Sequence, residues 1–66
     1  MNAQEIKNIR IALQRTQVGM AQIIGTTSIT VSRWERGESH PLPIYMAKLV
    51  KLRDYIIKKA EGGKSA

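Results

Sequence analysis

The chain is 66 residues long, carries eleven Lys and Arg residues against five Asp and Glu residues, and contains no Cys. This length predicts a single domain with a small core, and the missing Cys excludes disulfides and Cys-based metal sites. With one His and five acidic residues remaining, we expect no catalytic site, no metal site and no cofactor. The net charge of +6 favours a polyanionic partner, either nucleic acid or an anionic membrane surface. Neither a signal peptide nor a run of about 20 apolar residues is found, so we expect a soluble, cytoplasmic protein.

Three short helices are predicted in the first half of the chain. The first is expected over 4–15, where apolar residues recur at helical spacing, namely Ile6, Ile9 and Leu13. The second spans about 17–24, with Thr16 as its N-cap and Gly25 as its stop. A third fits 28–36, after which another glycine repeats the stop signal.

The second half of the chain predicts a loop and one long helix. Two prolines exclude a continuous helix over 38–43. From Pro43 to about residue 60 no Gly or further Pro interrupts the sequence, so one long helix is expected there. Paired glycines predict a mobile tail over 61–66. The predicted organisation is one all-α domain over 1–60, a compact bundle of four helices with five as the alternative, followed by this tail.

The long helix carries an apolar stripe that covers roughly 160° of its circumference, which is more than three short helices can bury. Its first half is expected to pack on those helices. The distal half is expected to find little of its own chain to pack against, which concerns Leu52, Tyr55, Ile56 and Ile57. We expect self-association through these residues. The alternative is that the distal half folds back over the first helix and completes an ordinary core.

The second and third helices fit a helix-turn-helix unit over about 17–36. Gly25 lies at the tight turn, Ala21 is small where the two helices would cross, and Val31 and Trp34 anchor the third helix. The opposite side of that helix carries polar and basic side chains together with one β-branched residue, namely Ile29, Ser32, Arg33 and Arg36. Arg bonds guanine bidentately, Ser bonds several bases, and Ile meets a thymine methyl group. Turn, spacing and charge together favour a DNA-reading helix over a merely solvated face.

The run TQVGMAQIIGTTSITVSRWERG resembles the lambda-repressor-like family of helix-turn-helix proteins, which includes phage repressors, Cro proteins and XRE-type regulators. The resemblance covers about residues 6–49. It is carried by nine positions, namely Arg10, Gln17, Ala21, Gly25, Val31, Trp34, Glu35, Gly37 and Pro41. It implies a compact bundle of four or five helices that binds operator DNA, usually as a dimer.

The resemblance also implies a role for individual side chains. The positions that would read bases are Thr27, Ser28, Ile29, Ser32 and Arg33. The positions that would contact phosphate are Thr16, Gln17, Arg36, Ser39 and His40. For His40, plain solvation is the alternative. Arg10 and Glu35 would form an ion pair that holds the third helix to the first, with a DNA contact of Arg10 as the alternative.

The chain departs from the family at three places. Gln14 and Arg15 stand where the family usually has Gly and an apolar residue, so the end of the first helix is expected to differ, and Arg15 faces either DNA backbone or solvent. Gly19 replaces a polar helix former and should weaken the second helix by roughly 1 kcal/mol relative to Ala. A close approach to DNA backbone and neutral drift are both open explanations for Gly19. Because no breaker follows the fourth helix, the fourth and fifth helices are predicted to be fused.

Together these features predict a sequence-specific regulator of transcription that binds double-stranded DNA. We expect no second, ligand-sensing domain, which favours a Cro-like or autoregulatory repressor that acts as a homodimer on a palindromic operator. The resemblance implies a bacterial, phage or mobile-element origin and a place at the nucleoid. The alternative is an antitoxin-type interaction module whose long helix docks a partner and whose DNA binding is secondary. Membrane binding would leave the helix-turn-helix spacing unexplained, and no enzyme activity is expected.

Overall fold

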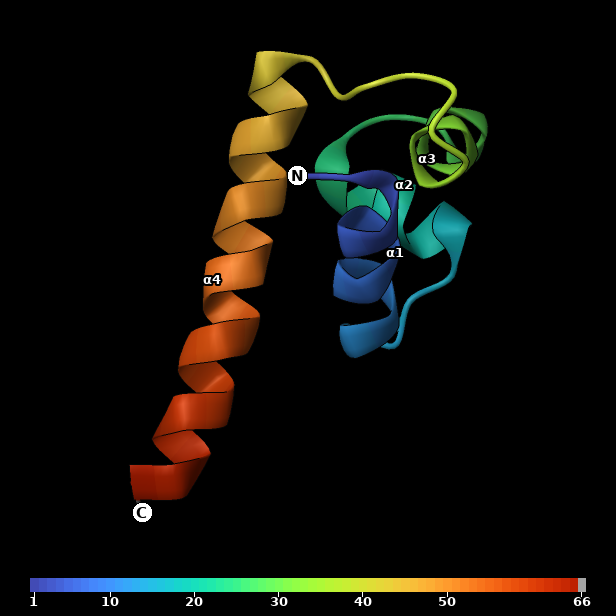
Figure 1. Cartoon of the computed structure of the whole chain (residues 1–66). Coiled ribbons are helices and arrows are strands. Elements are labelled where there is room, and N and C mark those ends of the chain that lie inside the picture. The colour runs from blue at the N-terminus through green and yellow to red at the C-terminus, as the bar shows by residue number, and fades with distance from the viewer. Residues whose placement is uncertain (66) are drawn as a thin grey trace.

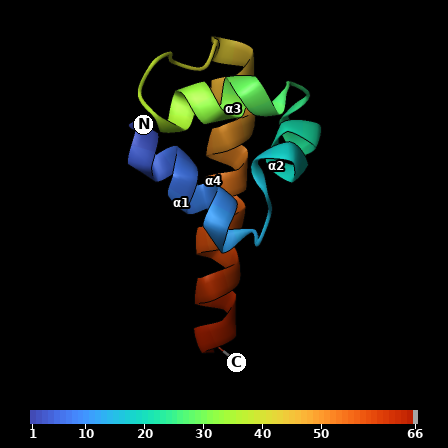
Figure 2. The same cartoon turned by 90° about the vertical axis from the view of Figure 1, so that its right-hand side faces the viewer.

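Four helices account for all the regular secondary structure in residues 1–65, which are the residues that the computed structural model describes, with side chains described as far as Glu61. They are α1 (Ala3–Ala12), α2 (Gln17–Ile24), α3 (Ser28–Glu35) and α4 (Pro43–Ser65). α3 and α4 lie on opposite sides of the bundle, at the right and left of Figure 1, and Figure 2 shows α3 across the front with α4 behind it. The predicted all-α architecture, with a helix-turn-helix and a long last helix, is confirmed.

Each short helix begins at a side chain that accepts a hydrogen bond from its first turn. Asn2, Thr16 and Thr27 are the N-caps of α1, α2 and α3. Asn2 accepts from the N–H of Glu5 at 2.8 Å, and Thr16 accepts from the N–H of Gly19 at 3.1 Å. These bonds satisfy backbone donors that have no partner inside the helix. They explain why α2 and α3 begin where the sequence predicts.

Gly25 ends α2 and starts the turn into α3. Its φ of 90° lies in the left-handed region, which a residue without Cβ adopts at little cost. The ammonium group of Lys48, from α4, donates to the carbonyl oxygen of Ile24 at 2.8 Å. A cation therefore meets the negative end of the α2 dipole and ties α4 to the helix-turn-helix unit.

The predicted extent of the first helix, to residue 15, is wrong. Gln14 has a φ of 57°, and its N–H donates to the carbonyl of Ile11 at 2.9 Å, while the N–H of Arg15 donates to that of Arg10 at 3.2 Å. This pair of bonds closes a helix with one left-handed residue, and α3 ends with the same pair around Gly37. α1 therefore ends earlier than predicted, because Gln14 adopts the left-handed backbone conformation that glycine usually takes at a helix end.

The core is built from all four helices. Its eight buried hydrophobic residues are Ile6, Ile9, Met20, Ala21, Ile24, Val31, Trp34 and Leu49. Ala21 is 3% exposed, in agreement with its expected place at a close crossing of α2 and α3. The rings of Trp34 and Tyr45 meet at a tilt of 47° with centroids 5.7 Å apart, which joins α3 to the start of α4.

α4 is one continuous helix, and it runs past the short helices in the direction away from α3 (Figure 2). The predicted fusion of a fourth and fifth helix is therefore observed. The expected end near residue 60 is wrong, because the helix continues to Ser65; the mobility predicted for 61–66 stays a prediction, and residue 66 lies outside the described residues.

The expectation that the distal half of α4 lacks packing partners in its own chain is wrong for two of its four residues. Leu52 and Ile56 are partly buried and pack against the core. Tyr55 and Ile57 are 55% and 49% exposed. A helix wheel does not distinguish the two packed residues from the two exposed ones, because it does not show that α1 covers only part of the apolar stripe of α4. Among the described residues, no helix combines the length and the apolar character that crossing a bilayer requires.

Candidate nucleic-acid interface

α3 presents two chemically different faces. Val31 is fully buried and Trp34 is 3% exposed, so both fix the helix to the core. Ile29, on the other side, is 63% exposed. Arg33 is also exposed, and Ser28 and Ser32 are half-buried. Among the described side chains, none of these four makes a side-chain hydrogen bond or an ion pair, so the polar groups of Ser28, Ser32 and Arg33 are open to an external partner.

The start of α2 and the outward face of α3 enclose a shallow groove of about 340 Å³. It brings together three residues predicted to read bases and two predicted to contact phosphate, namely Gln17, Ser28, Ile29, Ser32 and Arg36. The first N–H groups of α2 have no partner within the helix, and its dipole is positive at that end. The groove therefore combines anion-binding groups with neutral side chains of the kind that meet base edges.

Thr16 and Thr27 are both exposed at the starts of their helices, and both use their hydroxyl groups as caps. The Thr27 oxygen accepts from the N–H of Thr30 at 3.3 Å and shares a hydrogen bond with the Thr30 hydroxyl at 3.0 Å. Any base contact by Thr27 must therefore share an oxygen that already holds the first turn of α3.

The end of α3 and the loop before α4 carry three of the predicted phosphate contacts, namely Arg36, Ser39 and His40. The Arg36 guanidinium forms an ion pair with the carboxylate of Glu38, and both side chains are exposed. Ser39 is half-buried and His40 is exposed in the same loop. Sequence reasoning did not identify Glu38, whose carboxylate competes with a phosphate for the Arg36 guanidinium.

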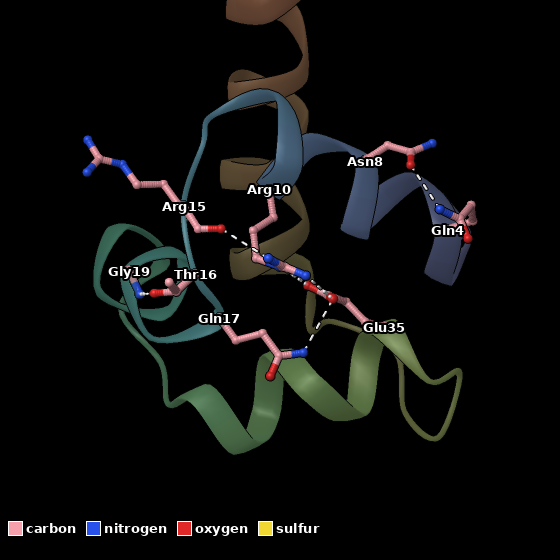
Figure 3. A network of polar contacts seen from close by, with 8 residues as sticks. All are labelled: Gln4, Asn8, Arg10, Arg15, Thr16, Gln17, Gly19 and Glu35. Atoms are coloured by element: carbon pink, nitrogen blue, oxygen red, sulfur yellow. Dashed lines mark hydrogen bonds and ion pairs between the residues drawn. The ribbon is translucent and has the colours of Figure 1, made fainter.

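Arg10 and Glu35 form a two-pronged ion pair that joins α1 to α3 (Figure 3). Arg10 Nε donates to Glu35 Oε2 at 2.8 Å, and Nη2 donates to Oε1 at 3.0 Å. The third nitrogen, Nη1, donates to the carbonyl of Arg15 at 3.0 Å. The side chains of Arg10 and Glu35 are 16% and 5% exposed. All three guanidinium nitrogens thus serve the fold, in line with the structural interpretation of Arg10.

Gln17 is joined to this ion pair as well as to the groove. Its amide nitrogen donates to Glu35 Oε1 at 3.4 Å (Figure 3). The sequence identified Gln17 only as a phosphate contact, and nothing in a separation of 18 residues indicates that its amide meets Glu35. The carboxylate that anchors α3 therefore also orients a side chain at the start of α2.

Glu35 keeps its charge in this setting. Burial raises the pKa of its carboxyl group, but the hydrogen bonds from Arg10 and Gln17, together with the charges of Arg10 and Lys7, outweigh burial and bring the pKa below its ordinary value. The pKa of Arg10 is raised in turn, chiefly by its hydrogen bond to Glu35. No buried side-chain nitrogen or oxygen lacks a hydrogen-bond partner in the part of the chain that the structure describes.

Two departures from the family pattern lie near the start of α2, where Gly19 is half-buried and Arg15 is exposed. A Cβ atom at Gly19 would lie 3.5 Å from the Thr16 oxygen and 3.6 Å from atoms of Arg15, which is ordinary contact. The fold therefore does not require glycine there. The Arg15 side chain is exposed and points away from the ion pair (Figure 3).

Comparison with known proteins adds one finding to this geometry. A family model described as helix-turn-helix matches residues 6–52, which is more than half of the chain. No curated protein and no solved structure matches the chain. Among residues 1–65, no three His, Asp or Glu side chains gather in a group that could hold a metal ion.

Proposed function

The chain belongs to the helix-turn-helix family of the XRE and Cro/lambda-repressor type, a DNA-binding and typically non-enzymatic family, and on that premise we propose that it is a sequence-specific transcriptional repressor. The observation that carries the proposal is the groove between α2 and α3, which gathers five predicted contact residues on the open face of the bundle. α4 lies on the opposite side, so a duplex has unobstructed access to this face (Figures 1 and 2).

In this proposal the outward face of α3 enters the major groove and reads bases. Arg33 pairs with the acceptors of a guanine, and Ile29 packs against a thymine methyl group. Ser28 and Ser32 bond to neighbouring base edges, and Thr27 adds a contact at the start of the helix. The assignment is supported by the lack of side-chain hydrogen bonds and ion pairs at Ser28, Ser32 and Arg33 among the described side chains.

Phosphates flank the bases in the same arrangement. Gln17 and the free N–H groups of α2 hold one phosphate, with Thr16 beside them. Arg36, Ser39 and His40 lie on the side of the α3 C-terminus and contact the backbone further along. Because Glu35 holds the Gln17 amide, Gln17 meets the phosphate with less loss of side-chain freedom than a solvated glutamine would.

We further propose that two copies bind a palindromic operator. The exposed Ile57 borders a groove of about 280 Å³ between α1 and α4, which also has Glu5 and Arg53 in its lining. Opposite charges on one surface allow reciprocal ion pairs across a two-fold axis. A dimer would have to place its two α3 helices about 34 Å apart to reach successive major grooves.

Selection of bound duplexes from a random pool, at two salt concentrations, tests the proposal. The expected result is a palindromic consensus whose affinity exceeds that of random DNA by about a thousandfold or more. Binding with no preference at either salt concentration would reduce the protein to a basic surface and reject the proposed reading of bases.

Sedimentation of Ile57→Asp, alone and with the selected duplex, tests the dimer. Ile57 is a better probe than the partly buried Ile56, because its exposed side chain can be changed without opening the core. We expect a dimeric parent and a folded monomeric variant, with Lys51→Asp as the exposed control on the same helix. An unchanged mass for folded Ile57→Asp would refute this interface.

A further inference from the structure

A second groove, of about 600 Å³, lies where α2 and the α1–α2 connection face the distal part of α4. Its lining is apolar at Leu13, Ile23 and Ile56, and Tyr55 stands beside them. Ile23 and Tyr55 are 42% and 55% exposed, so two large apolar side chains face solvent here. Exposed apolar side chains that share a groove mark a binding surface more often than isolated ones do.

The charged groups that line this groove are all of one sign. They are Arg15 and Lys59, and no acidic residue lines the groove with them. Among the described side chains, no carboxylate lies within ion-pair distance of either cation. The Lys59 ammonium lies 5.9 Å from the centre of the Tyr55 ring, which keeps it beside the apolar wall. An occupant that matches this surface must bring carboxylates as well as apolar side chains.

A second copy of the chain does not offer that combination. The chain has only five acidic residues, and three of them already pair within their own fold, namely Glu35, Glu38 and Asp54. The other two, Glu5 and Glu61, lie on different helices. Pairing two such grooves would also bring four cations together.

We propose that the groove binds an amphipathic, acidic helical segment of another protein, whose apolar side chains cover Leu13, Ile23 and Ile56 and whose carboxylates pair with Arg15 and Lys59. A helix laid in an apolar groove is a common mode of peptide recognition. No residue of α3 lines this groove, and the groove shares no lining residue with the one between α2 and α3, so its occupation leaves the outward face of α3 open. The proposal therefore does not depend on the DNA-binding role of α3.

Display of a peptide library against the full chain tests this proposal. The library consists of 16-residue peptides on a fixed Ala-Leu helical frame, with the remaining positions randomised. Selected peptides are expected to be rich in Asp and Glu on both sides of the apolar stripe. Calorimetric titration of a synthetic winner should show at least about tenfold weaker binding to Arg15→Glu/Lys59→Glu, since two attractive pairs become repulsive.

Lys51→Glu/Lys58→Glu is the matched control, because it makes the same change of charge at two exposed positions of α4 that line neither α4 groove. It should leave binding of the winner within about twofold. A library without binders, winners without acidic bias, or equal binding to the groove variant and the parent would each overturn the proposal.

Random-sequence duplex DNA is titrated in parallel. If the groove variant weakens DNA binding far more than the control does, Arg15 and Lys59 belong to the DNA-binding surface and the proposal fails. Loss of operator selectivity in an α3 variant has no bearing on it, so failure of the proposed repressor function and failure of this inference are distinguishable.

Discussion

The two faces of α3, a helix of only eight residues, have different roles. The inward face is fixed by Val31, Trp34 and the ion pair of Glu35. On the outward face, no side-chain hydrogen bond or ion pair to a described side chain is made by Ser28, Ile29, Ser32 or Arg33. In so small a domain every buried group counts toward a stability of a few kcal/mol. Changes on the inward face should therefore alter the free energy of unfolding and leave DNA affinity nearly unchanged. Changes on the outward face should do the reverse.

The largest effect is expected from the inward face. Glu35→Ala leaves Arg10 part-buried without its partner and should lower the free energy of unfolding by about 3 kcal/mol, measured by urea denaturation and circular dichroism. Glu38→Ala is the matched control, because its ion pair with Arg36 is exposed and is expected to contribute less than about 1 kcal/mol. Equal losses of unfolding free energy in the two variants would mean that the part-buried ion pair contributes no more than the exposed one.

Glu35 should also make the free energy of unfolding depend on pH. Because the pKa of Glu35 is lower in the folded state, its contribution is present above the ordinary value of 4.5 and is lost as pH falls through the folded-state pKa. The stability difference between parent and Glu35→Gln should therefore shrink as pH falls below about 4.5. A difference that stays constant from pH 7 to pH 3 would contradict the charged state of Glu35.

The outward face is expected to give a smaller effect of a different kind. Arg33→Ala should weaken binding to the selected operator by about 1–3 kcal/mol and relax the choice of base at one position. Its urea midpoint should match that of the parent, since Arg33 has no ion pair within the described residues. Unaltered operator affinity would show that Arg33 reads no base.

Helix ends sharpen the comparison, because α1 and α3 close with the same hydrogen bonds around different residues. Gln14→Gly should raise the free energy of unfolding by about 1 kcal/mol, since it removes a side chain from a left-handed position. The reciprocal change, Gly37→Gln, should lower it by a similar amount. Urea denaturation measures both, and a loss of stability in Gln14→Gly would mean that the Gln14 side chain contributes to the fold.

The smallest effect concerns a single methyl group on the DNA. Replacement of each thymine of the selected operator by deoxyuridine in turn should weaken binding of the parent by about 0.8 kcal/mol at the position that Ile29 meets. Ile29→Ala should bind both duplexes equally at that position. If no thymine replacement weakens binding of the parent, Ile29 packs against something other than a thymine methyl group.

Sequence reasoning succeeded where a local signal determines structure. The cap at Thr16, the turn at Gly25 and the buried pair Val31 and Trp34 all follow from residue type and helical spacing. The end of α1 was missed because glutamine gives no signal for a left-handed conformation, which Gln14 adopts under the constraint of the turn.

Contacts between distant segments were the other source of error. Residue spacing does not place the Gln17 amide on Glu35 or the Lys48 ammonium on the end of α2. Nor does a helix wheel show how far α1 reaches along α4, so the packing of Leu52 and Ile56 was not anticipated. Each of these contacts depends on where two helices cross in space, which periodicity leaves open.

The tilted aromatic pair of Trp34 and Tyr45 makes the protein a reporter of its own folding. Trp34 is the only tryptophan, so all indole emission comes from the inward face of α3. Burial should shift this emission to the blue, and Tyr45 should pass on excitation energy across 5.7 Å. Unfolding should abolish both signals. DNA on the opposite face should leave them unchanged, so unfolding of the free and of the DNA-bound protein can be followed by the same emission without a dye.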